Sequence, residues 1–247
     1  MTIRSESELA GMRRVGKLVA QTIAHMRALV DVGVSTAALD EAAETFARAV
    51  GARSAPRLTY DFPGFTCISV NEQIVHGIPG PRTLAAGDVV KLDVTLELDG
   101  FMADSAMTVV VPPASPQAVQ LQRAARVALA HGLAAARAGR RVRDIGRAID
   151  AAARREGVSV LRELGGHGIG RRLHESPSVP NWGDPSAREL LHEGLVLAVE
   201  PMIASAPARV VEERDGWTLS THNGALAAHR EHTIVIRRDE PLVLTAA

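Results

Sequence analysis

The chain has 247 residues, which is enough to bury a full hydrophobic core. Hydrophobic residues make up 46% of it, so the composition is that of a folded globular protein rather than a disordered one. Lys and Arg together number 28, as do Asp and Glu. This zero net charge argues against a dedicated nucleic-acid or membrane-surface binder.

Cysteine use and the N-terminal residues indicate the compartment. Cys67 is the single cysteine, so no intramolecular disulfide can form, and a reducing compartment fits. Residues 1–14 carry charges where a signal peptide needs an apolar core, and no window reaches the roughly 18 apolar residues of a membrane span. We therefore expect a cytoplasmic protein without a membrane segment.

In chain order, the predicted elements are two helices, a group of strands, two more helices and a second group of strands. Apolar spacing and capping residues place the helices at 6–30, 35–50, 116–137 and 142–156, and β-branched runs broken by turns place the first strands within 66–111. Ser115 and Pro116 are a typical cap and first residue of a helix. The remaining chain alternates strands and loops.

The second helix of each group overlays with a shift of 106 residues. Gly33 then matches Gly139, and Gly51 matches Gly157. Alanine-rich helices also align by chance, so the repeat stays a hypothesis. A duplicated α+β half would place a site at the seam between the halves. Because no linker of Gly, Ser and Pro separates them, we expect one domain over 1–247.

A hairpin turn is predicted at Asp99-Gly100, between two runs of alternating residues. With a two-residue turn, Asp93 lies opposite Ala106 and Asp104 opposite Thr95. Asp93 and Asp104 then project from one face as diagonal neighbours, with Cα atoms roughly 7–8 Å apart. Two buried like charges would repel unless a cation bound both or one were protonated. The alternative is a solvated face with scattered acids.

Five further residues are candidates, each with an ordinary structural alternative. His167 lies among glycines in GGHGIG, which lets the backbone approach whatever His167 binds. Glu200 ends an apolar run, where an unpaired carboxylate is costly. Glu231 shares one face of a predicted strand with His229 and Thr233, while His76 and His174 precede turns. A lone histidine in a turn is more often structural than a ligand.

Together, four acids and one imidazole form a hard, mostly oxygen ligand set for divalent ions such as Mn²⁺, Fe²⁺, Co²⁺ or Zn²⁺. The set is Asp93, Asp104, His167, Glu200 and Glu231. Two ions roughly 3.5–4 Å apart are the usual means of activating a water against an amide or ester. If the five side chains converge, the sequence predicts a hydrolase.

The chain resembles the type I methionine aminopeptidases over nearly its whole length. The segments that carry the resemblance are ELAGMRRVGKLVA, FPGFTCISVNEQIVHGIPG, KLDVTLELDGFMADSAMTV, GHGIGRRLHESPSVP, GLVLAVEPM and DGWTLSTHNGALAAHREHTIVI. The resemblance implies the α+β pita-bread fold, with two pseudo-symmetric halves around a dimetal site. Only 32 residues separate His167 from Glu200, which leaves no room for the helical insertion of type II relatives.

The same resemblance implies roles. Asp93 would chelate one ion, His167 with Glu200 the other, and Asp104 with Glu231 would bridge the two, which could be Co, Mn, Fe, Zn or Ni. A water or hydroxide between them would attack the first peptide bond of a chain that begins with Met. Glu200 would shuttle the proton, His76 would contact the scissile amide nitrogen, and His174 would stabilise the oxyanion.

The family's methionine pocket maps onto Phe62, Cys67, His76 and Trp217, with Thr59 at its edge. Three positions depart from the family. His229 stands where relatives commonly carry Gln, Phe65 replaces a small or polar residue, and Thr59 replaces an aromatic one. These changes affect the pocket's shape and the predicted preference for small second residues.

Two other readings remain. One is an X-Pro-type pita-bread peptidase, although those enzymes carry an additional N-terminal domain. The other is a non-catalytic pita-bread binding module, although all five ligand positions are intact here. For partners, we expect nascent N-termini that begin with Met, transient ribosome contact, no specific nucleic acid, no membrane, and a monomeric protein.

Overall fold

A computed structural model describes residues 1–246. Its helices are α1 (Glu6–Leu29), α2 (Thr36–Arg48), α3 (Ala55–Tyr60), α4 (Pro116–Ala135) and α5 (Val142–Arg155). The strands of the first half are β1 (Arg53–Ser54), β2 (Cys67–Val70), β3 (Gln73–Val75), β4 (Val89–Leu98) and β5 (Phe101–Val110). Those that follow α5 are β6 (Ser159–Val160), β7 (Gly165–Gly168), β8 (Glu175–Pro180), β9 (Val196–Val199), β10 (Met202–Ala204), β11 (Val210–Glu212), β12 (Leu219–Thr221), β13 (Ala227–His229), β14 (His232–Val235) and β15 (Leu242–Val243).

The four long helices begin and end close to their predicted positions, because their sequence signals are local. The Ser115 side chain accepts from the Ala118 amide at 3.1 Å, and Pro116 is the first residue of α4. Ser5 caps α1 in the same way, at 3.2 Å from the Glu8 amide. The short helix α3 was not predicted. Its six residues contain too little periodicity to identify it.

The predicted hairpin is confirmed in its register. Asp93 pairs with Ala106 and Thr95 pairs with Asp104, across the antiparallel strands β4 and β5. Asp99 and Gly100 both have positive φ, 53° and 77°, as a type I′ turn requires. The turn therefore fixes which face the two aspartates share.

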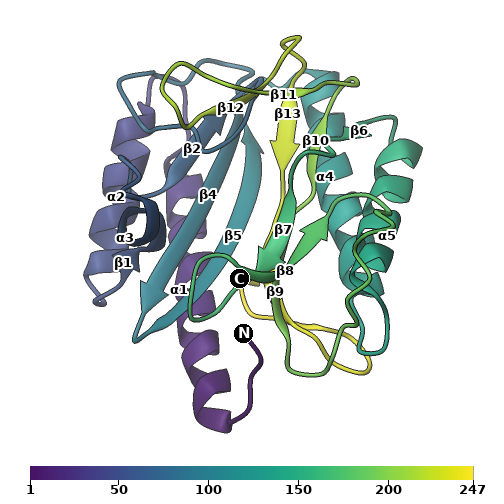
Figure 1. The fold of residues 1–247 in the computed structure, drawn as a ribbon. Helices are drawn as coiled ribbons and strands as arrows, with labels where there is room; N and C mark the ends of the chain where they lie inside the picture. The colour runs from purple at the N-terminus through teal and green to yellow at the C-terminus, as the bar shows by residue number, and fades with distance from the viewer. Residues whose placement is uncertain (247) are drawn as a thin grey trace.

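The two halves have matching hydrogen bonds, which supports the weak repeat. α2 begins at Thr36 and α5 at Val142, a shift of 106 residues. Just before α2, the Gly33 amide donates to the Leu84 carbonyl at 2.8 Å, and just before α5 the Gly139 amide donates to the Leu191 carbonyl at 2.8 Å. In Figure 1 the earlier half (purple to blue) and the later half (green) lie on opposite sides of the molecule, each with its own helices and strands.

The strands form four sheets. Their orders are β1-β4-β2 with β5 beside β4, β13-β10-β6, β11-β12-β3, and β15-β14-β9-β7-β8. The largest apolar cluster lies where α1 packs against β4 and β5, and a second lies between α4, α5 and the strands of the later half. Within residues 1–246, no helix combines the length and apolar character needed to cross a membrane.

A seam of hydrogen bonds joins β5 to the chain around β13 and β14. The Asp104 amide donates to Thr233 Oγ1 at 2.8 Å, and that hydroxyl donates back to the Asp104 carbonyl at 2.7 Å. The Glu231 amide donates to the Ala106 carbonyl at 3.0 Å. Predicted ligands from the two halves are thus held side by side by backbone contacts.

Replacing Gly146 by Ala should destabilise the protein. This is opposite to the usual effect, since Ala inside a helix is normally more stabilising than Gly by about 1 kcal/mol. A β-carbon on Gly146 of α5 would lie 2.2 Å from the carbonyl oxygens of both Pro180 and Trp182. We expect a loss of about 1–3 kcal/mol in the free energy of unfolding, measured by urea denaturation.

The matched control is Gly183→Ala, whose β-carbon would have its nearest neighbour, Arg147 Cβ, at an ordinary 3.5 Å. Its free energy of unfolding should change by less than about 0.5 kcal/mol. A Gly146→Ala variant as stable as the parent would contradict the close packing of α5.

Candidate metal centre

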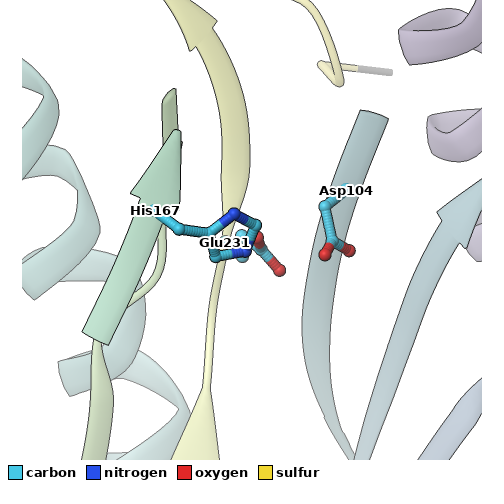
Figure 2. A group of neighbouring side chains, drawn as sticks. All are labelled: Asp104, His167 and Glu231. Atoms are coloured by element: carbon cyan, nitrogen blue, oxygen red, sulfur yellow. The ribbon is translucent and has the colours of Figure 1, made fainter. Parts of the chain in front are cut away.

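The five predicted ligands meet in one cavity between the halves. They come from β4, β5, β7, the residue after β9, and the link between β13 and β14, and are Asp93, Asp104, His167, Glu200 and Glu231. All five line a cavity of about 170 Å³. Figure 2 shows His167 and Asp104 approaching Glu231 from opposite sides. The convergence on which the hydrolase prediction depends is therefore present.

Asp93 and Asp104 lie close enough for their carboxyl groups to share a hydrogen bond, as the hairpin register predicts. Burial raises the pKa of Asp104 to about 6. Burial, and then the charge of Asp104, raise the pKa of Asp93 well above its usual value. One proton or one cation must reduce the repulsion between them. The alternative of a solvated hairpin face is excluded, because the Asp104 residue is only 7% exposed.

Two overlapping groups have the geometry of a metal site. Asp104, His167 and Glu231 each offer one ligand atom within 4.8 Å of the others, and so do Glu200, His229 and Glu231. Glu231 belongs to both groups, which is the arrangement that a bridging carboxylate needs. Asp93 belongs to neither group and lies beside Asp104.

His167 is oriented for metal binding by its backbone. Its Nδ1 lies 2.9 Å from the Gly168 carbonyl oxygen, which can only accept, so Nδ1 carries the proton. Nε2 is then free and lies 3.5 Å from Glu200 Oε1. A carbonyl that fixes the tautomer in this way is a common support for a metal-binding imidazole.

The glycines around His167 serve strand packing. A β-carbon on Gly166 would lie 2.2 Å from the Ala198 carbonyl oxygen in β9, and one on Gly168 would lie 2.3 Å from that of Ser176 in β8. Because these glycines have no side chain, the backbones of the neighbouring strands can lie close to β7. This close approach positions His167 opposite Glu200.

Unpaired buried atoms provide a test of whether the residues fit a metal. Asp104 Oδ1 and Glu231 Oε1 are buried without a hydrogen-bond partner among the described residues. Burial first, and then the neighbouring carboxylate charges, raise the pKa of Glu200 and Glu231 well above the usual range. Oxygen-rich, unneutralised clusters of this kind suit hard divalent ions. The residues present therefore fit the two ions predicted from the sequence.

An apolar slot adjoins the acids. Phe62 and Trp217 meet edge to face with ring centroids 5.2 Å apart, and Cys67 and His76 line the same cavity. Burial, followed by the charge of Asp93, raises the pKa of the Cys67 thiol well above its usual value. A thiol that keeps its proton is a poor nucleophile, so Cys67 is suited to packing within the slot.

Two departures noted in the sequence lie outside the cavity. Thr59 is exposed on α3 and is not one of the residues that line it, so its place at the pocket edge stays a prediction. Phe65 is 1% exposed and belongs to the large core cluster. Neither side chain therefore shapes the slot directly.

Tyr60 is a cavity residue that the sequence did not identify. Its hydroxyl lies 2.5 Å from His174 Nδ1, and the His174 ring lies 4.2 Å from that of His167, centroid to centroid. Tyr60 ends the unpredicted helix α3, and no local pattern connects it to a histidine more than a hundred residues away. It therefore orients a candidate catalytic side chain.

His229 and Glu231 do not belong to one continuous strand. β13 ends at His229, β14 begins at His232, and the two strands pair with different neighbours. The two side chains nevertheless meet as predicted, with His229 Nε2 3.7 Å from Glu231 Oε2.

Residues 10–238 match metallopeptidase family M24. This chain belongs to that family. It is 41% identical over 247 residues to methionine aminopeptidase 2 of Bacillus subtilis, a match that covers 99% of each chain. The crystal structure of methionine aminopeptidase from Rickettsia prowazekii matches it with a TM-score of 0.95 at 35% identity, over 100% of both chains. The predicted α+β pita-bread fold is confirmed.

More distant solved structures share the fold. Prolidase from Pyrococcus furiosus has a TM-score of 0.81 at 17% identity, and this chain covers 66% of its length. The likeness at that identity is one of fold alone. The higher identity and full coverage of the methionine aminopeptidases favour them over the X-Pro-type alternative.

Replacing Asp104 by Asn should stabilise the metal-free protein, with a gain that grows as the pH rises. Because burial raises the pKa of Asp104 from 3.8 to about 6, its folded state holds the proton more tightly than its unfolded state. The contribution of Asp104 to stability is full below the unfolded pKa and is lost as the pH rises through 6. The difference is on the order of 3 kcal/mol.

Urea denaturation of both proteins in EDTA, between pH 4 and pH 8, measures this difference. The gain should be small at pH 4 and level off above pH 7. A gain that shrinks as the pH rises would contradict the burial of this carboxyl. Saturating Co²⁺ should reverse the order, because the ion stabilises only the protein that binds it.

Proposed function

We propose that this chain is a metal-dependent aminopeptidase that releases N-terminal methionine from peptides and new proteins. The observation that carries the proposal is the continuity of the apolar, aromatic slot with the carboxylate cluster in one cavity. A thioether fits a polarizable, aromatic-lined slot. A methionine seated there would present its following peptide bond to the acids. The names of the similar proteins support the same substrate.

The ligand set would be the one that the family resemblance implies. Asp93 would hold one ion, His167 and Glu200 the other, and Asp104 and Glu231 would contact both. When bound, two divalent ions supply an activated water and a polarised scissile carbonyl. The chain's carboxyl groups would supply oxygen ligands in a cavity where burial and mutual repulsion raise their pKa values, so that a bound cation would relieve the repulsion.

Glu200 is suited to move the proton. Its carboxyl is buried and its raised pKa makes it a stronger base than an ordinary glutamate. It would take the proton of the attacking water and give it to the leaving amine. His76 lines the same cavity and would contact the scissile amide nitrogen.

His174 is suited to stabilise the oxyanion. In the tautomer in which Tyr60 donates to Nδ1, the other nitrogen, Nε2, carries a proton that it can donate. A donor that contacts the developing charge lowers the barrier by several kcal/mol. Tyr60 is then a positioning residue, since it touches His174 and acts through it.

We also propose the setting in which the protein works. We infer a single domain over 1–247 that acts as a monomer in the cytoplasm, on nascent chains and with transient ribosome contact. The family match over 10–238 and the unpaired, buried Cys67 support this setting. We expect a preference for small second residues, because that residue must pass beside the acids.

The test is methionine release from tripeptides of the form Met-Xaa-Ser, measured with and without Co²⁺ or Mn²⁺. We expect metal-dependent release that is fastest for small Xaa, and no cleavage of Ala-Pro. Glu231→Ala should lose both bound metal and turnover by orders of magnitude. Cleavage of Ala-Pro in place of Met-Ala-Ser would support the X-Pro alternative, and metal binding without cleavage would support a binding module.

His174→Ala should retain its metal while kcat falls by about 10²–10³-fold, as for loss of an oxyanion donor. Tyr60→Phe should show a smaller fall in kcat, because the imidazole remains and only its orientation is released. Elemental analysis and steady-state kinetics on Met-Ala-Ser measure the two quantities. Loss of metal from His174→Ala in parallel with kcat would instead make His174 a ligand.

A further inference from the structure

His229 is a buried histidine that the proposed mechanism does not use. His229 is 1% exposed, and neither of its ring nitrogens has a hydrogen-bond partner among the described residues. Buried polar atoms in native proteins are nearly always paired, and leaving one unpaired costs about 1–3 kcal/mol. Because Nε2 is unpaired and a neutral ring nitrogen can accept, it is available as a metal ligand.

The backbone of His229 is held in place by the seam with β5. The Thr108 hydroxyl donates to the His229 carbonyl at 2.7 Å and accepts from its amide at 2.9 Å. Both backbone polar groups of His229 are thus fixed by one side chain. His229 is the last residue of β13, and its side chain reaches the acids from the later half of the chain.

The distances from Nε2 are those of atoms that share an ion. Nε2 lies 3.3 Å from Glu200 Oε2 and 3.7 Å from Glu231 Oε2. Metal bonds of about 2.1 Å at angles of about 90–120° separate neighbouring ligand atoms by about 3.0–3.6 Å. A direct hydrogen bond to Glu200 at 3.3 Å would be long by comparison.

We propose that His229 is a sixth protein ligand of the metal centre and gives its Nε2 to the ion held by Glu200 and Glu231. This inference rests on the dimetal site proposed above and adds a second imidazole to it. Nitrogen donors favour Co²⁺, Ni²⁺ and Zn²⁺ over Mn²⁺. The consequence is a site whose preference is shifted away from manganese.

The test counts imidazoles on cobalt. Wild-type protein loaded with Co²⁺ alone, examined by X-ray absorption spectroscopy, should show about two imidazoles per pair of ions, from His167 and His229. His229→Gln should show about one, and its affinity for Co²⁺, measured by chelator competition, should fall at least tenfold. Its affinity for Mn²⁺ should fall less, since imidazole contributes less to binding that ion.

His232→Gln is the matched control. This histidine is also largely buried and lies three residues away, but its Nδ1 is paired with Thr245 Oγ1 at 2.9 Å and it belongs to neither metal group. It should keep the imidazole count and the Co²⁺ affinity of the wild type. Circular dichroism of each variant in EDTA checks its fold. If His229→Gln does not fold, the count in His174→Ala decides the question, because it should stay at about two when His229 is the second imidazole.

Two results would overturn the inference. One is a single imidazole per pair of ions in the wild type. The other is an unchanged count in His229→Gln with Co²⁺ and Mn²⁺ affinities lowered equally, which would make His229 a positioning residue for Glu200. Failure of the wild type to bind any divalent ion would instead refute the metal centre itself. Methionine release by the wild type is measured separately and tests the proposed function.

Discussion

The site depends on the hydrogen-bonded seam that holds β5 against the chain around β13 and β14. Through it Asp104 and Glu231 share a cavity although 126 residues separate them along the chain. Two buried carboxylates repel one another, so their closeness must be imposed by other contacts. The paired backbone and hydroxyl bonds of Thr233 with Asp104, and of Glu231 with Ala106, impose it.

The electrostatics of the cavity follow from that constraint. Burial raises the pKa of each carboxyl group and lowers the pKa of His167 to about 4, so the acids gain protons more readily and the imidazole stays neutral. A neutral imidazole is the form that binds a metal, whereas a protonated carboxyl group must release its proton when an ion binds. The protein thus leaves the cluster short of positive charge, which a divalent ion would supply.

Local rules predict much of this structure, and they fail where contacts are distant. The Asp99-Gly100 turn fixed the register of β4 and β5, and hence the pairing of Asp93 with Asp104 on one face, because turn type and side-chain alternation are local. Capping residues located α4 for the same reason.

Side chains of residues 229–233 were expected to alternate along one continuous strand. That expectation was wrong, since the chain changes partner strands between His229 and His232. It still placed His229 beside Glu231. No local rule could find Tyr60, whose role is set by its contact with His174. The convergence of the five ligands likewise depends on tertiary structure. Periodicity could not predict it, and the expectation came from the family resemblance.

The matching hydrogen bonds before α2 and α5 show that each half repeats one plan, yet the halves contribute unlike side chains to the cavity. The earlier half provides the aspartates of its hairpin, and the later half provides His167 and both glutamates. The group of Asp104, His167 and Glu231 draws on both halves, whereas Glu200, His229 and Glu231 all belong to the later one. An ion bound by the first group would act as a clamp across the internal symmetry axis, in addition to the hydrogen bonds that already hold β5 against the later half.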